Sequence, residues 1–97
     1  MLFVVIANDK PGTFGTRKAT REAHLAWLKG LGSKIKIAGP FLDSSQSIMN
    51  GSLLIIEAEN EAVARALAAQ DPYAKAGVFR RVEIKPWRWV VNPPGQA

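Results

Sequence analysis

The segment "TREAHLAWLKGL", residues 20–31, contains the one histidine of the chain, His24. Imidazole is the side chain that changes charge near neutral pH, so a single histidine can serve as both general acid and general base. His24, Leu28 and Leu31 lie on one stripe of a helix, which should face the sheet. The spacing allows two interpretations, a packing histidine hydrogen-bonded within the core or a reactive group at the edge of a pocket, and by itself it favours the first.

An acidic partner for this histidine has to come from elsewhere in the chain. Asp71, in "QDPYAKAG", lies between the second predicted helix and the last predicted strand, where the chain can bring a carboxylate to the end of the first helix. An Asp-Pro pair also commonly begins a helical turn, with Asp as the cap and Pro as the first residue. The sequence favours the cap, but a capping carboxylate keeps a free oxygen, so both roles are compatible.

Two candidate substrate-binding positions belong to predicted strands. Ser52 follows Gly51 at the head of a strand and shares a face with Leu54, so its hydroxyl can point towards the helices, although a serine there is more often a turn residue. Gly39 precedes Pro40, and a glycine at that place either makes a tight turn or lets a ligand approach the backbone.

Two arginines are candidates for holding an anion. Arg17 and Arg21 precede His24 by seven and three residues, which places them near its face of the helix. Either they are solvated or they attract an anionic ligand, and the sequence does not separate these alternatives.

The composition excludes several classes of site. The 97 residues include no cysteine and a single histidine, which removes disulfides, thiolate nucleophiles and multi-histidine metal sites. A Gly-rich phosphate loop is absent from the sequence, so we expect no metal and no cofactor. The opening apolar run, residues 2–7, is too short to span a membrane and lacks the basic start of a secretory signal, so we expect a cytoplasmic protein with no membrane partner.

The net charge of +5 raises the question of nucleic acid. The basic residues are scattered, and an anionic small molecule would suit them equally well. The RNA-recognition motif has the same order of predicted elements, but it stacks bases on aromatic residues of its third strand, and "SLLIIEAE" has none. We therefore expect a small organic partner, anionic or aromatic, and no nucleic acid.

Hydrophobic periodicity predicts an α+β domain of βαββαβ order, the ferredoxin-like arrangement, with two helices on one face of a four-stranded antiparallel sheet. The second strand is expected to end at Gly39-Pro40, and Asn60 to cap the second helix. The uncovered sheet face and the tryptophans of "PWRWVV" predict a homodimer. The domain should span residues 1–91 and a flexible tail residues 92–97, and the six elements are expected at residues 2–7, 16–31, 34–40, 52–59, 61–70 and 78–87.

Taken together, the segments "MLFVVIANDKPG", "AHLAWL", "IAGP", "GSLLIIEAE", "DPYAKAGVF" and "VEIKPW" resemble the YCII-related proteins along most of the chain. This resemblance implies a dimeric ferredoxin-like α+β barrel akin to muconolactone isomerase, with a cleft built around His24 and Asp71. The family includes a dehydrochlorinase of a chlorinated hydroxyquinol, in which the same pair is the suspected catalytic group. The variable loop at residues 41–51 and the tail leave the substrate open.

The resemblance makes a lyase-like or isomerase-like enzyme our leading expectation, with His24 moving a proton and Asp71 orienting the ring. Ser52, Gly39, Arg17 and Arg21 would then bind the substrate. The alternative is a non-catalytic domain that binds a small molecule or serves as an accessory dimerisation unit.

Overall fold

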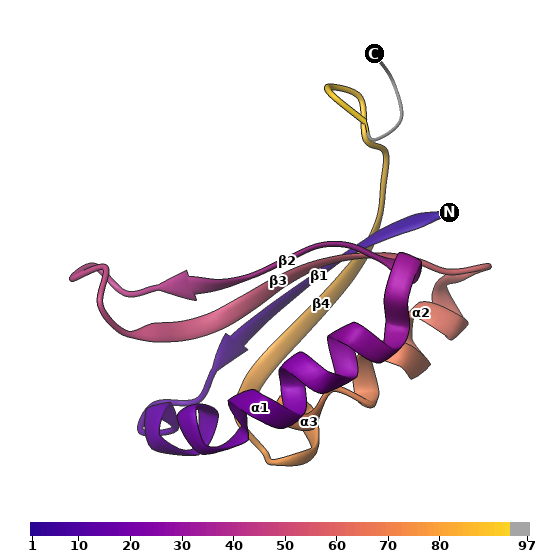
Figure 1. The fold of residues 1–97 in the computed structure, drawn as a ribbon. Helices are drawn as coiled ribbons and strands as arrows, with labels where there is room; N and C mark the ends of the chain where they lie inside the picture. Colours follow the sequence, from indigo (N-terminus) through magenta and orange to yellow (C-terminus); the bar gives the residue numbers. More distant parts are fainter. Residues whose placement is uncertain (94–97) are drawn as a thin grey trace.

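The computed structural model describes residues 1–93 and contains one sheet with helices on one side of it (Figure 1). The strands and helices follow the predicted order, with a 3-10 turn, η1, after the first helix and a short helix, α3, before the last strand. Their bounds are β1 Leu2–Asp9, α1 Phe14–Leu31, η1 Gly32–Lys34, β2 Ile35–Leu42, β3 Met49–Glu57, α2 Glu61–Ala69, α3 Pro72–Lys75 and β4 Phe79–Trp87.

The four strands pair in the order β2-β3-β1-β4, and every pair is antiparallel. Strand β1 occupies an inner position because its β-branched run has partners on both edges: Val5 lies opposite Leu54 of β3 and Ile84 of β4. This topology confirms the predicted ferredoxin-like α+β fold.

The core lies between the sheet and α2. Residues on one face of the strands alternate inward, as the period of two requires, and they pack against two alanines of α2. Ala64 and Ala68 are 0% and 8% exposed, so small side chains bring this helix close to the sheet. Asn60 caps α2 as predicted, since its side chain accepts a hydrogen bond from the Val63 N–H. The buried core residues are Phe3, Val5, Leu54, Ile56, Ala58, Ala64, Ala68 and Ile84.

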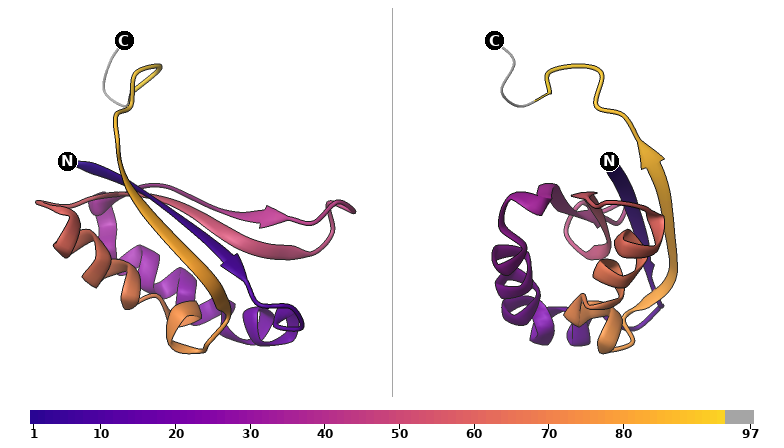
Figure 2. Two further views of the ribbon diagram at one scale, coloured as in Figure 1. Left: turned by 180° about the vertical axis from the view of Figure 1, so that it is seen from behind. Right: turned by 90° about the vertical axis from the view of Figure 1, so that its right-hand side faces the viewer.

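Helix α1 packs differently, because the two side chains that it buries are polar, Arg17 and His24. Its apolar contribution to the core comes from Trp27 and Leu28 near its C-terminal end, and both are only partly buried. The first half of α1 therefore meets the sheet and α3 through hydrogen-bonded polar groups. The views in Figure 2 show α1 and α2 on the same side of the sheet.

The predicted end of the second strand at Gly39-Pro40 is wrong. Strand β2 continues through Pro40 to Leu42, and Pro40 pairs with Ser52 of β3. Because β2 is an edge strand, it needs ladder hydrogen bonds on one side only, and an edge position tolerates a proline without an N–H. The extension places Gly39 and Pro40 in the strand next to Ser52, so these two residues continue the sheet instead of forming a turn.

The opposite face of the sheet is uncovered, and the chain after β4 runs away from the helices (Figures 1 and 2). Trp87 and Trp89 pack together there with ring centroids 5.6 Å apart. In the described part of the chain no helix combines the length and the apolar character needed to cross a membrane. Of the predicted tail, residues 94–97 lie outside the described residues.

Replacing Gly51 tests how tightly the start of β3 packs against its neighbours. A Cβ at this buried position would lie 2.5 Å from the Ala7 carbonyl oxygen and 2.7 Å from Phe41 Cδ2. We expect Gly51→Ala to lower the free energy of unfolding by about 1–3 kcal/mol, the usual effect of overpacking, as measured by urea denaturation. Gly30→Ala in α1 is the matched control, because a Cβ there meets nothing within 4 Å and alanine favours helix. Equal stabilities for the two variants would contradict this packing.

Candidate active site

The only histidine and the predicted aspartate meet. His24 Nδ1 lies 2.8 Å from Asp71 Oδ1, and the two residues are 7% and 2% exposed. The same Asp71 oxygen accepts a hydrogen bond of 2.9 Å from the Tyr73 N–H, and Pro72 is the first residue of α3. The carboxylate of Asp71 therefore serves both as the predicted helix cap and as the predicted partner of His24.

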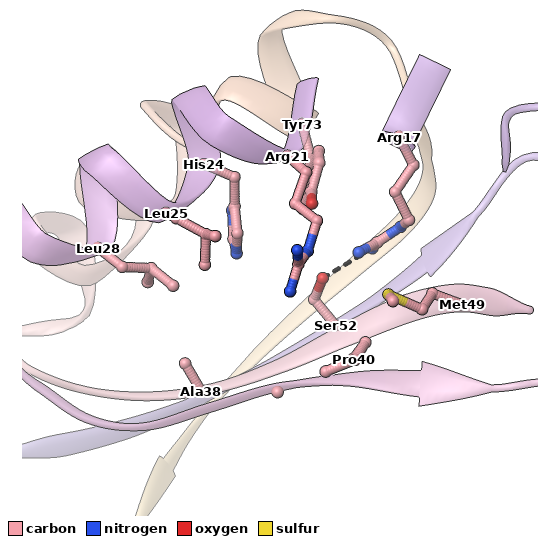
Figure 3. Close-up of a pocket in the computed structure, with 11 residues that line it drawn as sticks. Arg17, Arg21, His24, Leu25, Leu28, Ala38, Pro40, Met49, Ser52 and Tyr73 are labelled. Atoms are coloured by element: carbon pink, nitrogen blue, oxygen red, sulfur yellow. Dashed lines mark hydrogen bonds between the residues drawn. The ribbon is translucent and has the colours of Figure 1, made fainter. Parts of the chain in front are cut away.

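The contact with Asp71 determines which ring nitrogen of His24 is available to accept a proton. A carboxylate only accepts hydrogen bonds, so Nδ1 of His24 carries the proton that it donates to Asp71. In the neutral ring Nε2 then has a free lone pair. Figure 3 shows the imidazole pointing from α1 into the space above the sheet, so the free nitrogen faces that space. The arrangement suits a general base whose conjugate acid is stabilised by a buried carboxylate.

Tyr73, which the sequence analysis did not single out, holds this histidine in place. Its ring stacks on the His24 ring with centroids 4.1 Å apart and an angle of 20° between the planes. Burial raises the pKa of the Tyr73 phenol above its ordinary value, so the ring stays neutral at physiological pH. No local pattern in the sequence marks Tyr73, because its role depends on contacts with His24 and Arg17 from another part of the chain.

A second polar cluster lies beside the first. Arg17 Nε donates to Asp9 Oδ2 at 2.7 Å, and Arg17 Nη2 donates to Asp9 Oδ1 at 3.1 Å and to Ser52 Oγ at 2.7 Å. The guanidinium carbon also lies 4.2 Å from the centroid of the Tyr73 ring, a cation–π contact. Asp9, at the end of β1, was missed because its partner follows on the other side of a turn and no periodic pattern joins them.

Members of both clusters line a cavity of about 230 Å³ between α1 and the β2-β3 side of the sheet (Figure 3), but Asp9 does not. Of the predicted residues, Arg17, Arg21, His24, Gly39 and Ser52 line it, while Asp71 lies behind His24. The structure thus brings all six predicted site residues to one place. The remaining walls are formed by Leu25, Leu28, Ala38, Pro40, Met49 and Tyr73.

The two arginines differ in their surroundings. Arg17 is 3% exposed and ion-paired, whereas Arg21 is exposed and, within residues 1–93, forms no ion pair with a carboxylate. Figure 3 shows Arg21 pointing from α1 towards Ser52. Arg21 also borders an adjoining cavity of about 330 Å³ that reaches Phe14 and Lys18. Arg21 is therefore the cation available to a ligand entering from that side.

The polar lining is suited to acid–base chemistry. It offers one nitrogen acceptor, the hydroxyls of Ser52 and Tyr73 and one available cation, set among apolar side chains. No group of three residues of the kinds that bind metals comes together in the described part of the chain. The residues present can accept a proton, hold an oxygen and attract a negative charge.

Sequence comparison relates this chain to known proteins. An uncharacterized protein of Haemophilus influenzae is 41% identical over 97 residues, with 93% of this chain and 99% of that protein covered. The protein YciI of Escherichia coli is 38% identical with the same coverage.

A solved structure matches the fold closely. The 5-chloro-2-hydroxyhydroquinone dehydrochlorinase TftG of Burkholderia phenoliruptrix, in complex with 2,5-dihydroxybenzoquinone, superposes with a TM-score of 0.83. It is 36% identical, and the match covers 91% of this chain and 94% of that one. The model of the YCII-related domain matches residues 1–88, and the chain belongs to this family.

Proposed function

We propose that this protein is a proton-transfer enzyme that acts on a small cyclic molecule bearing oxygen substituents, by elimination or by isomerisation. The observation that carries the proposal is the 2.8 Å contact between His24 and Asp71, which leaves the second imidazole nitrogen facing the cavity. A buried carboxylate that orients a histidine in this way favours general-base catalysis.

In the reaction, Nε2 of His24 accepts a proton from the substrate, and the electron pair left behind forms a new double bond. In an elimination, the leaving group departs from the neighbouring carbon with its bonding pair. In an isomerisation, the imidazolium returns the proton at another atom. Asp71 stabilises the imidazolium in either case, because its charge lies against Nδ1 with little solvent between them.

The class of substrate follows from the cavity and from the related enzyme. A cavity of about 150 Å³ accommodates benzene, and the larger volume of about 230 Å³ here suits one substituted ring. The apolar walls favour a planar carbon skeleton, while Arg21 and Ser52 suit oxygen substituents, of which at least one is anionic. TftG binds such a ring, 2,5-dihydroxybenzoquinone, which supports the assignment.

We also propose that two copies of the chain pack through the uncovered face of the sheet. The cross-strand register places Val4, Ile6, Ile37 and Leu53 on this face, opposite to the core residues. The buried Ile55 lies among them, and β4 adds the charged Glu83 and Lys85 at one edge. An apolar surface over β1, β2 and β3 is usually covered in a stable protein, and a twofold axis lets one face cover its own copy.

Replacing His24 tests the catalytic proposal. We expect the wild-type chain to release chloride from 5-chloro-2-hydroxyhydroquinone, and His24→Gln to lower kcat at least a hundredfold, because the amide cannot accept and return a proton. Chloride release is followed with an electrode, and circular dichroism verifies the fold. Unchanged turnover in the variant, or no turnover by the wild type, would contradict the proposal. A rise in melting temperature with 2,5-dihydroxybenzoquinone without any turnover would instead identify a binding domain.

Arg21 should act on binding more than on chemistry. We expect Arg21→Gln to raise KM about tenfold, since a hydrogen bond to a charged group is lost, with little change in kcat. The salt dependence of KM should weaken at the same time. Arg65→Gln on α2, where the arginine is exposed and ion-paired with Glu61, is the matched control and should leave KM unchanged. A lower kcat at constant KM in the Arg21 variant would refute this role.

The dimer is tested by light scattering. We expect a mass of twice the chain for the wild type and a shift towards the monomer for Ile37→Lys, because a charge would be buried at the interface. Val63→Lys on α2 is the matched control, since Ile37 and Val63 are 39% and 38% exposed in the single chain. Equal masses for the two variants would rule out this face as the interface.

A further inference from the structure

We propose that Asp9 and Arg17 are positioning residues that make the Ser52 hydroxyl a hydrogen-bond donor directed into the cavity. The consequence for the ligand, which rests on the proposed function, is that it must present an oxygen acceptor to Ser52 and a proton to His24. An unsaturated ring with a hydroxyl group and a carbonyl oxygen meets both requirements.

Asp9 and Tyr73 hold the Arg17 guanidinium in place. Two of its nitrogens donate to the two carboxylate oxygens of Asp9, at 2.7 and 3.1 Å, in the fork geometry that suits a guanidinium. The planar group also lies against the Tyr73 ring, and Arg17 is 3% exposed. With its charge balanced by Asp9 and its plane fixed by Tyr73, Arg17 has one orientation, and Nη2 points at Ser52.

The contact with Arg17 restricts the direction of the Ser52 hydroxyl proton. A guanidinium donates hydrogen bonds and never accepts them, so the 2.7 Å contact occupies a lone pair of Ser52 Oγ. The positive charge of Arg17 also repels the hydroxyl hydrogen, which therefore points away from it. Within residues 1–93 the contact with Arg17 is the one side-chain hydrogen bond that Ser52 makes, and Ser52 lines the cavity. The hydroxyl proton of Ser52 therefore points into the cavity.

His24 and Ser52 present complementary hydrogen-bonding groups to the cavity. Asp71 makes the cavity-facing nitrogen of His24 an acceptor, and Arg17 makes the cavity-facing hydroxyl of Ser52 a donor. In each pair the buried neighbour has the same hydrogen-bonding character as the atom that faces the cavity: Asp71 and Nε2 of His24 both accept, whereas Arg17 and the Ser52 hydroxyl both donate. A bound ring is consequently oriented, with its acidic proton at His24 and its acceptor oxygen at Ser52. Arg17 acts on the ligand through Ser52, while Arg21 supplies the available charge.

The direction of the hydroxyl is tested without a ligand, by neutron diffraction on deuterium-exchanged crystals of the wild-type protein. We expect the deuterium on Ser52 Oγ to point into the cavity, towards a water or an open position. A deuterium directed at a carbonyl oxygen of the sheet would overturn the proposal, and this result would say nothing against His24 as the base. Failure of this inference and failure of the proposed function are therefore distinguishable.

The indirect role of Arg17 is tested by a double-mutant cycle, with 2,5-dihydroxybenzoquinone as the calorimetric probe. We expect Ser52→Ala to weaken its binding about tenfold, and Arg17→Lys, which keeps the charge beside Asp9, to weaken it by a similar factor. In the Ser52→Ala background, Arg17→Lys should change the affinity less than twofold, because there is no hydroxyl left to orient.

A fully additive cycle would show that Arg17 acts on ligand binding independently of Ser52 and would overturn the proposal. Arg65→Lys is the matched control, since it exchanges an ion-paired arginine on α2 far from the cavity and should leave the affinity unchanged. If Arg17→Lys fails to fold, the double variant Asp9→Asn/Arg17→Gln removes both charges together and takes its place in the cycle.

Discussion

The hydrogen bond between His24 and Asp71 is the interaction on which the rest of the site depends. A single carboxylate oxygen begins helix α3 and also receives the imidazole proton, so the local structure of "DPY" and the orientation of the histidine cannot vary independently. Because α3 carries Tyr73, the same cap also places the ring that stacks on the imidazole and on Arg17. One short helical turn thus organises side chains from three separate parts of the chain.

A second constraint comes from the buried face of α1, which carries a cation and an imidazole where an ordinary amphipathic helix carries leucines. Burying such groups without partners costs several kcal/mol, and each of them has partners here: Asp9 and Ser52 for Arg17, and Asp71 for His24. These partners come from β1, β3 and the cap of α3. The cavity exists because this half of α1 contacts the sheet through polar side chains instead of closely packed apolar ones. The site therefore takes the place of part of the apolar core.

The order of the elements and most of the candidate site could be predicted from the sequence. Each feature that was missed has its own physical reason. The element order follows from alternating strands and a capped helix at Asn60, which are local signals. The sequence also places His24 on the stripe of the helix that faces the sheet. Its spacing favours a packing role, and only the resemblance to the YCII-related proteins paired it with Asp71. The end of β2 was missed because a proline stops an inner strand but not an edge strand, and strand order is a property of the whole fold. Asp9 and Tyr73 were missed because their importance arises from contacts across the fold.

Because the chain contains a single histidine, its tautomer can be measured directly. Nitrogen-15 NMR of protein labelled at histidine gives one pair of ring signals, which report the protonation of each nitrogen without overlap. At a pH where the ring is neutral, we expect a protonated Nδ1 and an unprotonated Nε2, and we expect Asp71→Ala to destroy this preference. A neutral ring protonated at Nε2 in the wild-type protein would leave no base facing the cavity and would rule out the proposed pairing of His24 with Asp71.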